Sequence, residues 1–189
     1  MADEMTDGIE MVVESVRVHM LSSRHVVILK DSARDRYLPI WIGPWEASAI
    51  AMRLQGIAPE RPLTHDLFGT VLGELGVRVD RVLIASLAEE TFHARLVLVG
   101  ADSRHVVDAR PSDAIALAVR LGAPIYAAPE VLDQAALNAD TAGEDEDVPL
   151  GEPPESIGER IPDARLDVFR EFVNSLDVED RGEGRGPQS

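Results

Sequence analysis

The fold is organised around one strand-to-helix junction, Asp108-Ala109-Arg110-Pro111-Ser112-Asp113-Ala114-Ile115-Ala116-Leu117-Ala118. Residues 105–108 predict a short strand, and Pro111 favours a helix start because a proline in the first turn leaves no N–H without a partner. Within the helix expected over residues 112–121, the run Ala114-Ile115-Ala116-Leu117-Ala118-Val119 is apolar all round, and Gly122 follows the helix. Such a helix is buried on more than one side, so other elements must pack around it.

Segments with strand patterns flank this junction, and segments with helical spacing interrupt them. β-branched residues predict strands over residues 11–20, 25–29, 37–42, 77–87, 92–99 and 105–108. Apolar residues with helical spacing predict helices over residues 45–54, 64–75 and 112–121. Residues 125–128 and a turn after Pro129 close the domain. The pattern predicts an α+β (mixed α/β) fold, a strand-rich single domain with about three helices that spans residues 9–136.

The acidity of the chain is concentrated after this domain. Among 189 residues, 34 are Asp or Glu and 18 are Lys or Arg, which gives a net charge of −16. Up to Ala135 there are 13 basic and 19 acidic residues, net −6, whereas the remainder has 5 and 15, net −10. We expect an acidic linker over residues 137–161, an amphipathic helix over residues 162–178 and a disordered tail over residues 179–189. The helix either docks on the domain or a second subunit, or binds a partner as a tethered segment.

Several function classes are excluded or disfavoured by what the sequence lacks. There is no cysteine, which removes disulfides, thiolate zinc sites and cysteine nucleophiles. The P-loop, dinucleotide-binding, His-Glu-x-x-His and Gly-x-Ser-x-Gly motifs are absent as well. The strong negative charge disfavours simple electrostatic binding to DNA or to a membrane. With no signal-like N-terminus and no apolar run of roughly 18 to 20 residues, we expect a cytoplasmic protein without membrane contact.

Three polar clusters lie at the expected helix starts, and each has a structural and a functional interpretation. Glu46, in the first turn of its helix, either interacts with the helix dipole or serves as a metal ligand or general base. In the second cluster, Arg61-Pro62-Leu63-Thr64-His65-Asp66-Leu67, helix initiation accounts for Thr64 and Asp66 but not for His65. An adjacent His-Asp pair can also bind a divalent cation.

The third cluster is the strand-to-helix junction itself. Asp108 closes the strand, Asp113 opens the helix, and Arg110 lies between them. Two carboxylates that face each other across this turn favour Mg²⁺ or Mn²⁺, as in many sites that cleave phosphodiesters. Alternatively, Asp113 only starts the helix and Arg110 forms a structural ion pair with Asp108. Spacing alone leaves both interpretations open.

Taken together and in this order, the three clusters resemble the bifunctional nuclease (BFN) domain family. The matching segments are Leu38-Pro39-Ile40-Trp41-Ile42-Gly43 with Glu46-Ala47, Arg61-Pro62-Leu63-Thr64-His65-Asp66-Leu67, and Asp108 to Ala118 with Pro124-Ile125. The resemblance extends from Met11 to about Leu132 and excludes the acidic tail. It implies a compact mixed α/β domain that forms a homo-oligomer, a dimer or higher, and a nuclease activity on both RNA and DNA.

We expect one site, in a cleft where the three helix starts converge. Its catalytic residues are His65, Asp66, Asp108, Arg110 and Asp113. Its substrate-binding residues are Arg61, Arg110 and Ser112. Its metal ligands are Glu46, Asp66, Asp108 and Asp113. In this hypothesis Mg²⁺ or Mn²⁺ activates a water, His65 transfers a proton, and Arg110 stabilises the pentavalent phosphate.

The charge of the domain leaves two other functions open. A domain of net −6 binds a polyanion weakly unless a metal ion or a cluster of arginines offsets the repulsion. One alternative is a non-catalytic regulatory protein that binds an anion or nucleotide at its helix N-termini, with Arg61 and Arg110 as anchors. The other is an assembly protein, in which the helix over residues 114–121 is buried between subunits.

Overall fold

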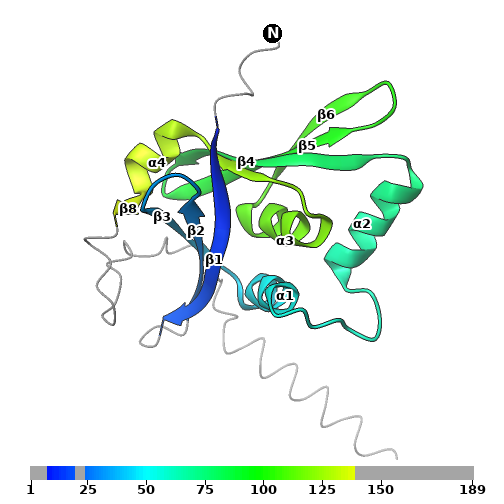
Figure 1. Ribbon diagram of the computed structural model, residues 1–189, viewed down its shortest axis with the longest axis horizontal. Coiled ribbons are helices and arrows are strands. Elements are labelled where there is room, and N and C mark those ends of the chain that lie inside the picture. The colour runs from blue at the N-terminus through cyan, green and yellow to red at the C-terminus, as the bar shows by residue number, and fades with distance from the viewer. Residues whose placement is uncertain (1–7, 20–23, 139–189) are drawn as a thin grey trace, which may run out of the picture. The chain divides into compact units, whose positions relative to one another are not determined.

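The computed structural model describes residues 8–19 and 24–138 of the chain. Within them the chain forms one eight-stranded sheet and four helices (Figure 1). The strands are β1 (Ile9–His19), β2 (Arg24–Asp31), β3 (Arg36–Ile42), β4 (Arg78–Ala88), β5 (Thr91–Val99), β6 (Arg104–Ala109), β7 (Ile125–Ala127) and β8 (Leu137–Asn138). The helices are α1 (Pro44–Leu54), α2 (Thr64–Glu74), α3 (Pro111–Leu121) and α4 (Pro129–Ala135). The predicted α+β class is confirmed.

Two antiparallel halves make up the sheet, whose strand order is β6-β5-β4-β7-β1-β2-β3-β8. β4, β5 and β6 form one half, and β1, β2, β3 and β8 form the other. The short strand β7 joins them, because it pairs parallel with β4 and antiparallel with β1. Since α3 connects the edge strand β6 to this central strand, it packs across β4 and β5 on the way.

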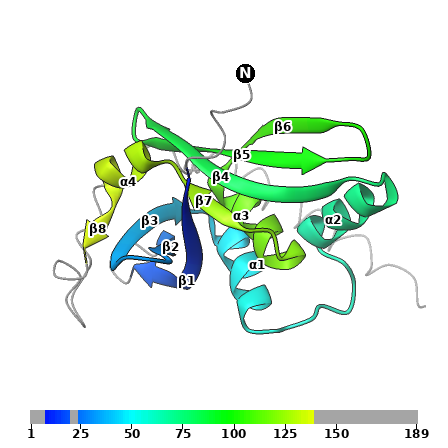
Figure 2. The same cartoon turned by 45° about the horizontal axis from the view of Figure 1, so that its top comes forward.

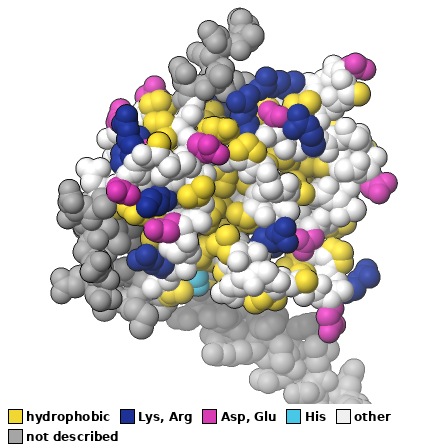
Figure 3. Space-filling model, in the orientation of Figure 1, with side chains coloured by type: hydrophobic (Ala, Val, Ile, Leu, Met, Phe, Trp, Pro, Cys, Tyr) yellow, Lys and Arg dark blue, Asp and Glu magenta, His cyan; other side chains and the backbone are white. Residues whose placement is uncertain are grey.

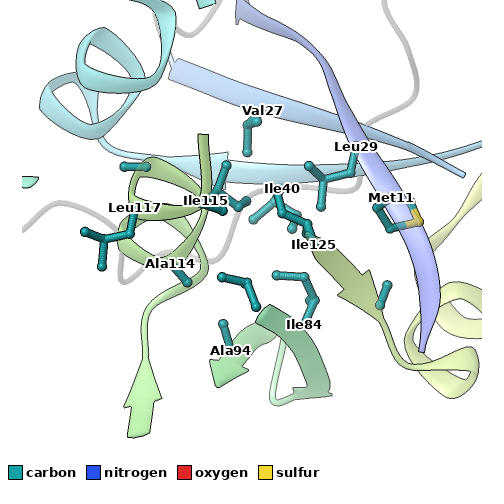
Figure 4. Packing of buried hydrophobic residues seen from close by; sticks show 14 of the residues in the cluster. Met11, Val27, Leu29, Ile40, Ile84, Ala94, Ala114, Ile115, Leu117 and Ile125 are labelled. Carbon is teal, nitrogen blue, oxygen red and sulfur yellow. The ribbon is translucent and has the colours of Figure 1, made fainter. Parts of the chain in front are cut away.

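Helix α3 lies in the middle of the hydrophobic core. Seven of its eleven residues are buried, and it contacts α1, α2, β4 and β5. Figure 2 shows α1, α2 and α3 gathered on the same side of β4 and β5. In Figure 4, Ile115 from α3 points toward side chains of the sheet, such as Ile40 and Ile125. Burial on several sides, as predicted from the apolar circumference of this helix, is confirmed.

One helix differs from the sequence prediction. A turn was expected after Pro129, but this proline begins the seven-residue helix α4. A helix this short is marginal on its own and carries too few residues to show a period of 3.6. Val131 and Leu132 are only 1% and 2% exposed, so contacts with the core stabilise α4. These contacts with distant parts of the chain cannot be inferred from a local pattern.

Residues 139–189 lie outside the described part of the chain. With them lie nearly all of the predicted acidic linker, the amphipathic helix and the tail, which stay predictions. None of the helices in residues 8–19 and 24–138 has the length and apolar character that a membrane crossing requires.

Candidate active site

The first turns of α1, α2 and α3 each carry one carboxylate, from Glu46, Asp66 and Asp113 respectively. A carboxylate at this position interacts favourably with the partial positive charge of a helix N-terminus. The interaction with the helix dipole therefore accounts for the position of these three carboxylates. Each of these carboxylates also forms an ion pair with an arginine, and helix initiation does not require such a pair. Arg110 binds Glu46 and Asp113, and Arg120 binds Asp66.

Arg110 connects the start of α1 to the start of α3. It precedes Pro111, which disfavours helical backbone at the residue before it, and its φ of −67° and ψ of 142° are accordingly extended. From this position its Nε donates to Asp113 Oδ2 at 2.8 Å, and its Nη2 donates to Glu46 Oε1 at 2.7 Å. The guanidinium therefore bridges two carboxylates that are 67 residues apart in the sequence (113 − 46).

His65 extends this bridge to the start of α2. Its Nε2 lies 3.2 Å from Oδ1 of Asp113, the oxygen that Arg110 does not use. Glu46, Arg110, Asp113 and His65 thus form one continuous set of hydrogen bonds, which we call the Arg110 network. The predicted convergence of the three helix starts holds for these four residues.

Exposure differs sharply within the Arg110 network. The side chains of Glu46 and His65 are 16% and 15% exposed, whereas that of Arg110 is 67% exposed. Glu46 and the imidazole are therefore largely covered, Asp113 is about one third exposed (34%), and the guanidinium faces solvent. Hydrogen bonding to Asp113, together with that to Glu46, raises the pKa of Arg110 above its ordinary value despite partial desolvation. The network presents a fixed cation to an incoming ligand.

Asp66 belongs to a second network around Arg120. It accepts a hydrogen bond from the Leu63 N–H at 2.9 Å and one from Arg120 Nε at 2.8 Å. Burial acts to raise the pKa of Asp66, but these two donors outweigh it and the pKa lies below its usual value. Arg120, 7% exposed, also donates to the carbonyl oxygens of Ala49 and Ala116. It thereby ties α1, α2 and α3 together.

Arg120 is a residue that the sequence analysis did not single out. The available signal was a charged residue in the last turn of a helix that is otherwise apolar all round. A buried arginine needs partners for its five N–H groups, which predicts nearby carbonyls and a carboxylate. Through Asp66, Arg120 holds the start of α2, which also carries His65, against α3.

Within the described residues, no hydrogen bond or ion pair joins the other predicted site residues, Asp108, Arg61 and Ser112, to the Arg110 network. Asp108 is exposed in β6, where its backbone is in register with Arg95. In the described part of the chain no hydrogen bond or ion pair joins Asp108 to Arg110, which binds Asp113 and Glu46 instead. Arg61 is exposed before α2, and Ser112 is 6% exposed in the first turn of α3.

The donor set favours a guanidinium over a metal ion. Glu46 and Asp113 both direct carboxylate oxygens at Arg110, which takes the place of a shared cation. Among the residues that the structure describes, no group of three or more His, Asp or Glu side chains is arranged to hold a metal. In this arrangement the residues do not fit Mg²⁺ or Mn²⁺, because Arg110 would have to move away first.

The fold and the Arg110 network define a mixed α+β domain whose polar groups converge at three helix starts. Residues 27–140 match the model of the bifunctional nuclease domain, and the chain belongs to this family. The family resemblance predicted from the three clusters is confirmed. The match includes every residue of the Arg110 network.

Similar proteins occur in bacteria and plants. An uncharacterized protein of Mycobacterium tuberculosis is 38% identical over 171 residues, which cover 90% of this chain and 96% of that protein. Bifunctional nuclease 1 of Oryza sativa subsp. japonica is 26% identical over 114 residues, 58% of this chain and 34% of the rice protein. Bifunctional nuclease of Oryza minuta matches with the same identity and coverage.

Proposed function

We propose that this chain is a nuclease that hydrolyses phosphodiester bonds of DNA and RNA, and that Arg110 binds the phosphate to be cleaved. The observation that carries the proposal is a solvent-facing guanidinium held by two carboxylates, with a His65–Asp113 pair beside it. Membership of the bifunctional nuclease domain family supports the same reaction.

Arg110 keeps donors available for a ligand while its partners hold it in place. A guanidinium has five N–H groups, and the network uses the Nε donor and one from Nη2. The remaining donors can bind the non-bridging oxygens of a phosphate and stabilise the charge that builds on them as phosphorus becomes pentacoordinate. An arginine suits this task because its planar fork matches two phosphate oxygens at once.

His65 is placed to move a proton. Asp113 holds its Nε2, orients the ring and stabilises the imidazolium, which leaves Nδ1 for proton transfer. In the proposed step a water oxygen bonds to phosphorus, His65 accepts the proton of that water, and the bond from phosphorus to the leaving oxygen breaks. Return of the proton to the leaving oxygen restores the imidazole.

Charge within the site keeps substrate binding weak. With His65 neutral, two carboxylates and one guanidinium sum to −1 in the Arg110 network. The described residues contain 13 basic and 16 acidic side chains, net −3. Repulsion of a polyanion is therefore offset only locally, at Arg110, and weak binding to DNA and RNA is part of the proposal.

Replacing Arg110 tests the proposal. We expect Arg110→Gln to lower kcat/KM on a single-stranded oligonucleotide by about 100-fold or more, because one oxyanion donor contributes roughly 10²–10³. Arg104→Gln removes an exposed arginine of β6 and is the matched control, with activity unchanged. Equal activity in the two variants would overturn the assignment of Arg110. Oligonucleotide binding without cleavage in the wild type would favour the non-catalytic alternative.

Chelation of divalent metals distinguishes a reaction carried by Arg110 and His65 from a reaction at the metal site expected from the sequence. Cleavage that persists in EDTA supports a reaction carried by Arg110 and His65. Loss of cleavage in EDTA, with recovery on addition of Mn²⁺ or Mg²⁺, supports the metal site instead. In that case Glu46 and Asp113 must exchange Arg110 for the ion.

A further inference from the structure

A cavity of about 190 Å³ lies directly beside the Arg110 network. The end of β3, the turn between β4 and β5, and the start of α3 form its walls. Arg110 belongs to both the cavity and the network. Gly43, also in the lining, is so close to Glu46 that a Cβ added there would meet the Glu46 carboxylate. Cavity and network therefore share a wall.

The chemistry of the lining indicates which class of ligand fits the cavity. Trp41 and Phe92 contribute aromatic rings, and most of the remaining surface is aliphatic. Arg110 is the cationic residue of this lining, and Glu90, Thr91 and Ser112 supply other polar groups. A flat, largely apolar ring attached to an anion uses both parts. Free phosphate would contact only the polar part of the lining, and a purely apolar ligand would make no use of the donors that Arg110 keeps for an anion.

The size of the cavity points to a single ring system. Its volume of about 190 Å³ is below the ~300–1,000 Å³ of sites for drug-sized ligands. A nucleobase fits this scale, and stacking of a base on an aromatic side chain contributes about 1–3 kcal/mol irrespective of which base it is.

We propose that this cavity is a nucleobase pocket, which binds the base of the nucleotide whose phosphate is held by Arg110. The inference rests on the proposed function for its substrate class, and it adds a subsite that the Arg110 network does not contain. Because the pocket receives a base and not the sugar, it accepts deoxyribonucleotides and ribonucleotides alike. Stacking in the pocket also adds binding free energy, which compensates for the weak electrostatic attraction between the acidic domain and nucleic acid.

Fluorescence of a single tryptophan tests the pocket directly. The chain has two tryptophans, and Trp45 is 83% exposed, so Trp45→Phe leaves Trp41 as the only reporter without disturbing the core. Titrations of this full-length variant compare adenosine 5′-monophosphate with ribose 5-phosphate and with inorganic phosphate. We expect the nucleotide to change the emission of Trp41 and to bind at least about fivefold more tightly than ribose 5-phosphate. Equal affinities would overturn the proposal.

Two substitutions in the same background localise the effect. Phe92→Leu keeps an apolar side chain against the core but removes the ring, and we expect it to weaken nucleotide binding while ribose 5-phosphate binds as before. Thr91→Phe fills the pocket and should abolish the preference for the nucleotide. His93→Phe is the matched control, since it lies on the same strand two residues further on and outside the lining. The same loss in His93→Phe and Thr91→Phe would contradict the pocket.

The test of the nucleobase pocket and the test of the nuclease activity can fail independently. Nucleotide binding with the expected preference, but no cleavage, retains the pocket and overturns the nuclease. Cleavage that requires Arg110, with equal affinity for nucleotide and ribose 5-phosphate, retains the nuclease and overturns the pocket.

Discussion

Arg110 depends on Glu46, and Gly43 leaves the space in which the Glu46 carboxylate lies. A methyl group at Gly43 would meet that carboxylate, which is the flexible end of a side chain and can move aside. We expect Gly43→Ala to melt close to the wild-type temperature but to lose roughly 10- to 100-fold in kcat/KM, because the guanidinium is no longer held in place.

Gly73→Ala is the control for this prediction. Gly73 lies within α2, and a Cβ there meets nothing within 4 Å. Alanine in the middle of a helix is more favourable than glycine by about 0.5–1 kcal/mol, and Gly73 lies in the last turn of α2, so this variant should melt at the wild-type temperature or slightly above it with unchanged activity. Loss of activity in both variants, or in neither, would contradict the role given to Glu46.

Two carboxyl groups make the free energy of unfolding depend on acid pH. Burial acts to raise the pKa of Asp31, but hydrogen bonds from the Ala33 N–H and the Arg36 guanidinium outweigh it, and the pKa lies below its usual 3.8. The pKa of Asp66 is lowered in the same way. Since both values are lower in the folded form than in the unfolded chain, their stabilisation is complete above pH 3.8 and is lost as the pH falls through the folded values.

Urea unfolding between pH 6 and pH 2 measures this contribution. We expect the midpoint to fall steeply below about pH 4 in the wild type. Asp31→Asn should cost about 3–5 kcal/mol at pH 6, because it leaves the largely buried Arg36 without its anion, and should flatten the acid dependence. Asp35→Asn, in the same loop at a carboxylate that is 74% exposed, should change stability by under about 1 kcal/mol. An unchanged midpoint from pH 6 to pH 2 would refute the assignment.

At the scale of elements, the turn between β4 and β5 is strained. Its two central residues, Glu89 and Glu90, have φ of 48° and 60°, values that favour glycine or asparagine. We expect the double substitution E89N/E90G to raise the free energy of unfolding by about 1 kcal/mol or more, as measured by urea denaturation. E90Q changes the charge but not the backbone preference, and it should leave stability nearly unchanged. A destabilised E89N/E90G variant would show that the side chains, and not the backbone, fix this turn.

Local chemistry made the main elements predictable. Pro111 and Gly122 mark the start and end of α3, and the apolar circumference between them correctly implied burial. The same reasoning placed Glu46, His65, Arg110 and Asp113 at helix starts. Contacts between these starts depend on the strand order of the sheet, in which β7 joins two halves. No local pattern contains that information.

The sequence did not predict which side chains of the site bind each other. Asp66 and His65 are neighbours in the chain, yet Asp66 binds Arg120 and His65 binds Asp113. Successive residues of a helix point in different directions, so a single position decides which network each one joins. The sequence analysis also missed the aromatic wall of the cavity. Trp41 and Phe92 lie in segments with ordinary strand patterns, and only the folded chain brings them together beside the start of α3.

At the scale of the whole molecule, the charge distribution determines how nucleic acid can bind. On the face shown in Figure 3, basic and acidic side chains alternate among apolar ones, with no continuous basic surface. Under the proposed function, this face offers nucleic acid few phosphate contacts. We expect the logarithm of the association constant for single-stranded DNA to fall with the logarithm of salt concentration with a slope of only about −1 to −2.

Binding isotherms between 50 and 300 mM salt measure that slope, and Arg110→Gln should reduce its magnitude by about 0.7, the value for one contact to single-stranded nucleic acid. Arg104→Gln should leave the slope as it is. A wild-type slope near −5 would mean that a broad basic surface exists and that Arg110 is not the principal phosphate contact.

The central claim is that one site, built around Arg110, cleaves both DNA and RNA. The most direct test is kcat/KM of wild type and Arg110→Gln on a DNA and an RNA oligonucleotide of the same sequence. We predict that both activities fall by about the same factor, roughly 100-fold or more, while Arg104→Gln cleaves both as the wild type does. Loss of only one activity, or of neither, would contradict a shared site.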